Sequence, residues 1–136
     1  MHARTASCAC GALTITVDRD SDWVYGCACP SCQKRSGSVF AYVAMFPAEA
    51  VVSYTGVFTT WRRTGETGFW TEHDFCTTCG SRLVIRMLDQ PGRIGISVGN
   101  FTDPTFPAPA AMIWSSTLHN WLELPAGIKT VPSFER

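Results

Sequence analysis

Seven cysteines in three short groups constrain this chain more than any other feature of its sequence. The groups are Cys8-Ala9-Cys10, Cys27-Ala28-Cys29-Pro30-Ser31-Cys32 and Cys76-Thr77-Thr78-Cys79. An odd number of cysteines cannot pair completely within one chain. Residues 1–7 hold no apolar stretch typical of a secretory signal, so we expect a reducing, cytoplasmic location. In such a compartment clustered cysteines bind metals or take part in catalysis rather than form disulfides.

The spacing within the groups suits zinc, which takes four ligands in a tetrahedron and binds thiolates well. The C-x-x-C group is followed by Gly80, and glycine accepts the backbone angles with which a chain leaves such a turn. Cys8 and Cys10, if they lie on a strand, share one face and can converge on the same ion. Seven thiols divide into a closed four-ligand site and a three-ligand site with an open position. Spacing leaves the pairing open, because the central triplet can also share an ion with the third group.

A redox function for Cys29-Pro30-Ser31-Cys32 is disfavoured by its surroundings. A thioredoxin-like motif lies between a strand and a helix, and the helix N-terminus lowers the pKa of the thiol. Here a β-branched and aromatic run begins at Ser38, so any helix ends within two turns. No strand–helix–strand pattern surrounds the motif.

The apolar residues alternate mostly with period two, which predicts a mainly β protein in which residues 1–136 form a single domain. The expected strands are Leu13–Val17, a doubly buried strand within Ser38–Phe46, a strand or pair over Val51–Trp61, and Gly68–Phe75. Leu83–Met87 and Ile94–Val98 flank a Pro-Gly turn and predict a hairpin. Asp103–Pro109 is expected to be an extended loop and Leu118–Leu124 a short helical turn.

The balance of charges excludes some classes of binding partner. Eleven basic and eleven acidic residues give no net charge, so the basic footprint of a nucleic-acid or anionic-membrane binder is missing. The longest apolar run, Val39–Phe46, is far shorter than the roughly 20 residues that span a bilayer. We therefore expect no nucleic-acid partner and no membrane; the oligomeric state stays open.

The ordered motifs resemble those of the glutathione-dependent formaldehyde-activating (GFA-like) family. They are C-x-C-G near the start, C-x-C-x-x-C followed by basic residues and Ser-Gly, and Phe-Cys-x-x-Cys-Gly, with late Ile-Trp and Trp positions. The resemblance covers nearly the whole chain and implies a zinc-containing β-tent fold. It assigns a structural zinc to Cys8, Cys10, Cys76 and Cys79. It assigns a second zinc, a labile ion with an open fourth coordination position, to Cys27, Cys29 and Cys32.

The implied activity is that of a carbon–sulfur lyase resembling S-(hydroxymethyl)glutathione synthase. Its substrate would be an adduct between glutathione, or another thiol, and formaldehyde or another small aldehyde. Two positions depart from the family pattern: Gln33 stands where an arginine is frequent, and Met112 where a histidine is common. The alternative is a zinc-stabilised binding module without turnover. The triplet discriminates between them, because a purely structural module needs only the four-cysteine site.

Further residues near the triplet are candidates for substrate binding. Three thiolates outweigh the charge of the ion, so the open site suits a soft thiolate ligand. Lys34 and Arg35 can hold a substrate carboxylate, and Ser36-Gly37 can turn backbone N–H groups toward a ligand. His73, between two acidic residues, is expected to be exposed, as is His119. The tryptophans at 61, 70, 114 and 121 are expected mainly in the core, with one free to line the pocket.

Overall fold

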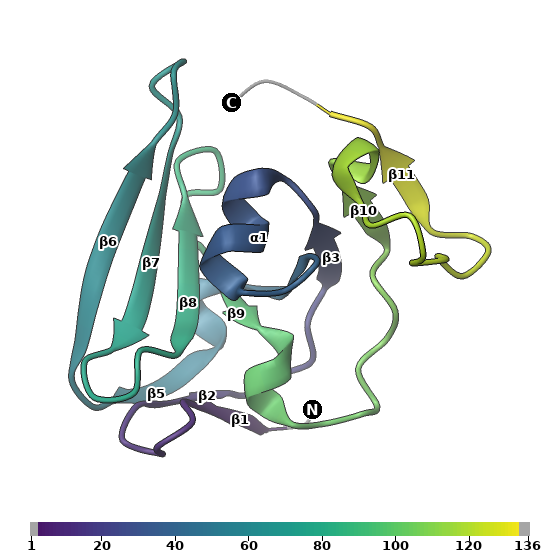
Figure 1. Ribbon diagram of the computed structural model, residues 1–136. Coiled ribbons are helices and arrows are strands. Elements are labelled where there is room, and N and C mark those ends of the chain that lie inside the picture. The colour runs from purple at the N-terminus through teal and green to yellow at the C-terminus, as the bar shows by residue number, and fades with distance from the viewer. Residues whose placement is uncertain (1–2, 134–136) are drawn as a thin grey trace.

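A computed structural model describes residues 3–133 and shows a mainly β protein, as expected (Figure 1). The large sheet contains β3 (Trp23–Cys27), β4 (Ala41–Pro47), β6 (Phe58–Thr64), β7 (Trp70–Cys76), β8 (Arg82–Met87), β9 (Arg93–Ser97), β10 (Ala111–Ile113) and β11 (Lys129–Val131). The small sheet contains β1 (Arg4–Ser7), β2 (Thr14–Val17) and β5 (Val51–Thr55). One α-helix in the described chain, α1 (Pro30–Ser36), follows β3.

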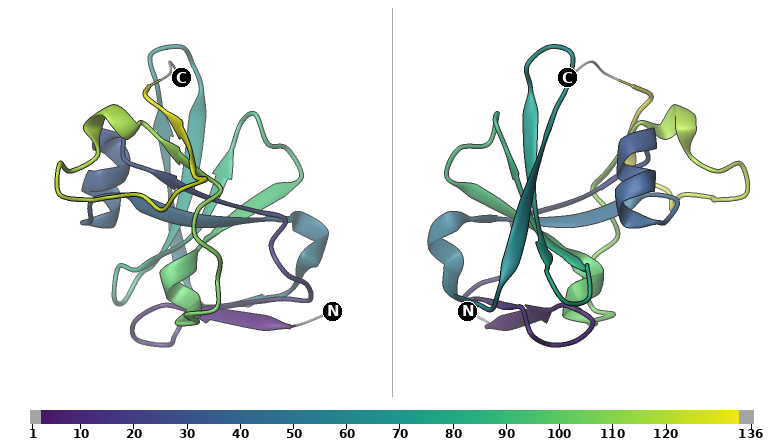
Figure 2. Two further views of the ribbon diagram at one scale, coloured as in Figure 1. Left: turned by 90° about the vertical axis from the view of Figure 1, so that its right-hand side faces the viewer. Right: turned by 60° about the vertical axis from the view of Figure 1, so that its left-hand side comes forward.

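The large sheet has the order β11-β10-β3-β4-β9-β8-β7-β6, and the small sheet has the order β1-β2-β5. Neighbouring strands are antiparallel, except that β10 runs parallel to both β3 and β11. The small sheet lies at one end of the molecule in each view of Figure 2. Three short 3₁₀ helices, Ala48–Ala50, Val98–Phe101 and Ser115–Thr117, connect the strands.

The strand pattern follows the sequence closely. Leu13, Ile15 and Val17 are fully buried and alternate with half-buried threonines, as period two predicts. The predicted hairpin is confirmed as β8 and β9, with Gly92 at a φ of 76° in the turn. That positive φ is one that glycine adopts without steric cost.

Strand β4 is buried on both faces, as the uninterrupted apolar run predicts. Ala44 and Phe46 belong to a core shared with the small sheet. Val43 and Met45 belong to a second apolar cluster that also includes Cys27 and Ile113. Other members of this cluster, including Cys27 and Ile113, line the cavity described below.

Helix α1 has caps that fix its short length. Cys29 is its N-cap, with Pro30 in the first turn, where the absent N–H of proline is no loss. Gly37 ends the helix in the left-handed conformation, at a φ of 63°, and its N–H donates to the Gln33 carbonyl. The expectation that a helix here ends within two turns is therefore confirmed.

In the segment Leu118–Leu124, expected to form a short helical turn, the Leu122 N–H donates to the His119 carbonyl at 3.0 Å and closes one turn; the 3₁₀ helix Ser115–Thr117 precedes it. The expectation for the tryptophans was wrong. The tryptophans are not mainly in the core, since Trp61 is 45% and Trp121 68% exposed. The Trp61 ring contacts His73 of the neighbouring strand, and the Trp121 ring contacts His119 in the C-terminal segment. Among the described residues, no helix is both long enough and apolar enough to cross a bilayer.

Candidate metal centres and substrate pocket

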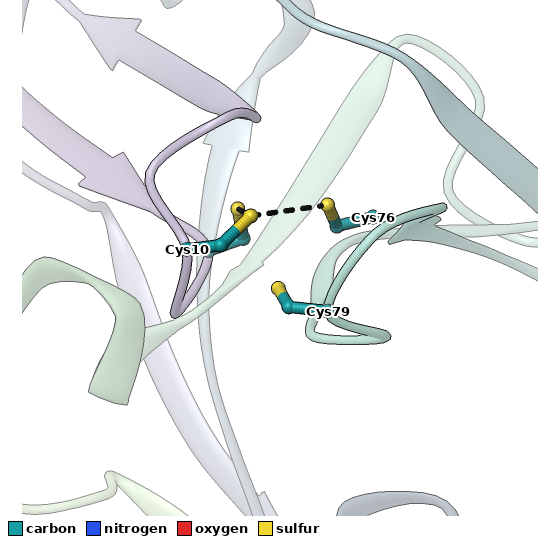
Figure 3. Close-up of side chains that lie close together, drawn as sticks. Cys10, Cys76 and Cys79 are labelled. Carbon is teal, nitrogen blue, oxygen red and sulfur yellow. Dashed lines mark hydrogen bonds between the residues drawn. The ribbon is translucent and has the colours of Figure 1, made fainter.

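The first and third cysteine groups meet at the junction between the two sheets. The Sγ atoms of Cys8, Cys10, Cys76 and Cys79 all lie within 4.8 Å of one another. Cys10 Sγ is 3.6 Å from Cys8 Sγ and 3.8 Å from Cys76 Sγ, and Cys79 approaches from the following turn (Figure 3). A tetrahedron with metal–sulfur distances of about 2.3 Å has edges of about 3.8 Å. These four thiols therefore fit a closed zinc site.

The turn at Cys8–Cys10 differs from the strand expected there. Strand β1 ends at Ser7, and the Gly11 N–H donates to the Cys8 carbonyl at 3.0 Å. A tight turn rather than a shared strand face thus brings Cys8 and Cys10 together. On the other side, Gly80 at a φ of 76° donates its N–H to the Cys76 carbonyl at 2.9 Å, as the C-x-x-C-G pattern predicts.

The four-cysteine site also has a hydrogen-bond donor that favours a thiolate. The Ser81 hydroxyl lies 3.2 Å from Cys79 Sγ, and hydrogen bonds from its side chain and backbone lower the pKa of Cys79 to about 5. Cys8 and Cys76 are buried, whereas Cys10 and Cys79 are exposed. The site is thus anchored in the core and reaches the surface on one side.

The middle group forms a separate cluster. Cys27 ends β3, Cys29 caps α1, and Cys32 lies in the first turn of the helix; their three Sγ atoms lie within 4.8 Å of one another. The Cys32 backbone N–H donates to Cys29 Sγ at 3.3 Å. Hydrogen bonds from the Cys27 and Cys32 thiols lower the pKa of Cys29 to about 2, and the same contacts raise the pKa of Cys27. The cluster fits three ligands of a metal ion.

All three cysteines of the middle group line a cavity of about 270 Å³. Apolar side chains from the large sheet, including Ile85, Met87 and Ile113, form part of its wall. Cys8, Cys10, Cys76 and Cys79 do not line this cavity. The two metal centres therefore differ in kind: one lies at the sheet junction and the other at a pocket.

Arg35 links the helix to this pocket. Its Nη1 donates to Ser31 Oγ at 2.6 Å and its Nη2 to Cys32 Sγ at 3.1 Å. Its Nε is buried and has no hydrogen-bond partner among the described residues. Residues three and four apart share one face of a helix, which is why the side chains at 31, 32 and 35 meet.

The other predicted substrate residues lie elsewhere. Lys34 is exposed on another side of α1, in a shallow hollow with Thr117. Ser36 is exposed and accepts the Ser38 N–H, while Gly37 serves as the helix C-cap. The structure thus brings Arg35 to the cysteine triplet, but it does not bring Lys34, Ser36 or Gly37 into the cavity.

The two departures from the family pattern have structural roles. The Gln33 side-chain amide donates to the Ala28 carbonyl at 2.7 Å and to the Thr117 carbonyl at 3.0 Å, and so ties α1 to the C-terminal segment. Met112 is fully buried, and its methyl group lies where a Cβ on Gly26 would be. Neither side chain lines the cavity.

The cavity is also lined by Arg63, Thr71 and Phe69, which the sequence did not predict as pocket residues. Arg63 and Thr71 face each other across the β6–β7 pair, and only this strand register brings them together. Trp114 fulfils the expectation that one aromatic residue lines the pocket, and it has a φ of 61° that is uncommon for a bulky side chain. Within residues 3–133 no carboxylate lies within ion-pair distance of Arg35, Arg63 or Arg82.

The prediction that His73 is exposed was wrong. His73 is 2% exposed, and its neighbour Asp74 is fully buried. Asp74 accepts hydrogen bonds from Tyr54, Thr60 and Arg86, so its charge is compensated inside the fold. Burial, together with the positive charges of Arg35, Arg82 and Arg63, lowers the pKa of His73 to about 3. The charged residues around His73 in the sequence gave no indication of its burial. The bulged pairing of β7 with β8 buries both His73 and Asp74.

The fold and the two cysteine clusters define a mainly β protein with two candidate metal centres, one of them at a pocket. The chain belongs to the family of glutathione-dependent formaldehyde-activating enzymes, which matches it over residues 3–117. A crystal structure of a Rhodobacter sphaeroides protein, a structural-genomics target, has the same fold, with a TM-score of 0.58 and 23% sequence identity. That similarity covers 76% of this chain and 91% of the other. No curated protein matches the sequence.

Proposed function

We propose that this protein is a zinc-dependent carbon–sulfur lyase that forms and cleaves the adduct between formaldehyde and a thiol of the glutathione class. The observation that carries the proposal is that Cys27, Cys29 and Cys32, whose sulfurs lie together, line a largely apolar cavity. A cluster with only a structural role has no need of a cavity. Membership of the family supports a glutathione-related, formaldehyde-activating function.

The zinc would be held by the residues that the sequence singled out. Cys8, Cys10, Cys76 and Cys79 would hold the structural ion, and Cys27, Cys29 and Cys32 the ion at the pocket. When bound at the pocket, zinc supplies a soft coordination position for a substrate thiolate. The donor set fits this use, because three thiolates leave the centre anionic and therefore weak at activating water.

The cavity walls indicate what class of thiol is accepted. Arg35 and Arg63 both line the cavity, and neither is paired with a carboxylate of the described chain. Guanidinium groups bind carboxylates through paired, charge-assisted hydrogen bonds. A thiol carrying carboxylates, such as glutathione, complements these two side chains. The apolar residues of the wall hold the small aldehyde away from bulk water.

The reaction balances without any further reactant. The substrate sulfur forms a bond to the carbonyl carbon, and the π pair of the carbonyl moves onto the oxygen. The proton that the thiol releases ends on that oxygen, which gives an S-hydroxymethyl adduct. Cleavage is the reverse. The chain contributes by placing the thiol and the aldehyde together, which lowers the entropic part of the barrier.

The decisive experiment is ¹³C exchange NMR on glutathione and labelled formaldehyde with catalytic amounts of protein, paired with metal analysis. The wild type is expected to accelerate adduct exchange above the spontaneous rate and to bind two zinc ions per chain. The Cys27/Cys29/Cys32→Ser variant is expected to stay folded with one zinc and to give only the background rate. Adduct binding by the wild type without acceleration would instead establish a binding module. One zinc in both proteins would overturn the assignment of the pocket site.

A further inference from the structure

Strand β7 carries a hydrogen-bonded pair toward the cavity. Thr71 and His73 are two residues apart and therefore lie on the same face of the strand. Thr71 lines the cavity together with the cysteine triplet, and it is 8% exposed. His73 lies behind it, beside Arg82 of the neighbouring strand β8. The row Arg82–His73–Thr71 thus runs toward the pocket.

Arg82 fixes which atom donates and which accepts in each hydrogen bond of this row. Arg82 Nη1 lies 3.3 Å from His73 Nδ1, and a guanidinium can only donate. Nδ1 is therefore the acceptor, and the ring proton of neutral histidine is on Nε2. His73 Nε2 lies 2.8 Å from Thr71 Oγ1, so the imidazole donates and the hydroxyl oxygen accepts.

The surroundings keep His73 in this neutral form. The ring is buried, and three guanidinium groups, those of Arg35, Arg63 and Arg82, oppose its protonation. A protonated ring would also carry a proton on Nδ1, which would face the N–H of Arg82. The geometry and the charges therefore favour the same tautomer.

The hydroxyl proton of Thr71 is left available. Because Thr71 Oγ1 accepts from His73, its own O–H must donate in another direction. Within the described part of the chain, Oγ1 has no second hydrogen-bond partner. The cavity is the open space beside this side chain. Thr71 is thus a hydroxyl donor oriented by a buried, neutral histidine.

We propose that Thr71 donates a hydrogen bond to the aldehyde oxygen of the substrate, and that His73 and Arg82 are positioning residues for that donor. This inference rests on the proposed lyase function. As sulfur bonds to the carbonyl carbon, negative charge develops on the oxygen, and the Thr71 O–H stabilises it. The Thr71 proton stays on Oγ1, and the proton released by the thiol completes the hydroxymethyl group. In cleavage the same contact stabilises the negative charge on that oxygen before the carbon–sulfur bond breaks.

The first test compares Thr71→Val with Thr71→Ser by adduct exchange and thermal melting. Valine keeps the shape but removes the hydroxyl, and we expect a loss of about 100-fold in kcat with little change in KM for glutathione. Serine restores the donor and is expected to recover most of the rate. A Thr71→Val protein as active as the wild type would overturn the proposal. Absence of catalysis in the wild type would instead overturn the lyase function, and this inference with it.

The second test first determines the tautomer of His73, which does not require turnover, and then compares the rates of two variants. ¹⁵N NMR of the histidine ring nitrogens is expected to show His73 as the neutral Nε2–H tautomer, with the resonance identified by its absence from His73→Gln. In kinetics, His73→Gln keeps a side-chain N–H near the Nε2 position and should retain more activity than His73→Leu. An Nδ1–H tautomer, or equal rates for the two variants, would overturn the positioning role.

Discussion

Arg35 Nη2 donates a hydrogen bond to Cys32 Sγ at 3.1 Å, across one turn of α1. The same guanidinium holds Ser31 Oγ, while its Nε is buried without a partner among the described residues. One side chain therefore contacts a candidate metal ligand and lines the cavity beside it. This arrangement explains why the cation at position 35, rather than the one at 34, belongs to the site.

Arg35→Ala is expected to lower kcat/KM for adduct exchange by about 10- to 100-fold, the usual effect of removing a partner of a metal-ligating group. Arg35→Lys keeps the charge but not the planar fork, so it should recover only part of the loss. Lys34→Ala, on another side of the helix, should stay within about twofold of the wild type, since it removes no contact in the cavity. Equal losses at both positions would contradict this assignment.

Arg63 is expected to select for thiols that carry a carboxylate. Arg63→Ala should raise KM for glutathione about tenfold, the loss expected for one charge-assisted hydrogen bond. KM for 2-mercaptoethanol, which has no carboxylate, should not change. Arg62→Ala is the matched control, because Arg62 is exposed, pairs with Glu72 and lies over Trp70. A tenfold rise for both thiols would show a structural rather than an electrostatic role.

The sequence was most informative where local rules decide the structure. Alternation predicted the β2 strand, and the Pro-Gly turn predicted the β8–β9 hairpin, because both depend on neighbouring residues. Zinc ligand numbers gave the four-plus-three division of the cysteines, but the assignment of particular cysteines to each site came from the resemblance to a family and not from spacing. The coordinates bring the sulfurs together in those two groups. Their use as zinc ligands stays a prediction.

The sequence was least informative where distant strands determine the surroundings of a residue. His73 and Asp74 are flanked by charged and polar residues, yet the β6–β7–β8 pairing buries them. Arg63 becomes a pocket residue only through its register with Thr71. The expectation for Trp61 failed for the same reason, because Trp61 lies on β6 opposite His73 of β7. Such positions require the tertiary structure.

Cys76→Ser is expected to unfold the protein, whereas Cys32→Ser should remain folded. The four-cysteine site joins segments that are 66 residues apart, between Cys10 and Cys76. Zinc binding of about 10–16 kcal/mol in small zinc domains is comparable with the whole stability of a domain, about 5–15 kcal/mol. Circular dichroism, melting temperature and zinc content check this. A soluble Cys76→Ser protein with wild-type melting and one zinc fewer would contradict the structural role.

Buried His73 should make the stability depend on pH below neutrality. Its pKa is lowered to about 3 from an ordinary value of 6.5. Between these two values the histidine binds a proton in the unfolded chain but not in the folded protein. The free energy of unfolding therefore falls as pH drops below 6.5 and continues to fall toward pH 3. At pH 5.5 the loss from this group relative to pH 8 is about 1.4 kcal/mol.

The measurement is urea unfolding of the wild type and His73→Gln between pH 8 and 5.5, with zinc content followed at each pH. Glutamine cannot titrate, so the stability of the variant should fall less steeply than that of the wild type. Acid also weakens thiolate–metal bonds, but it does so in both proteins, and the difference between the two curves isolates His73. Parallel curves would mean that His73 titrates alike in the folded and unfolded chains, which its burial beside three arginines opposes.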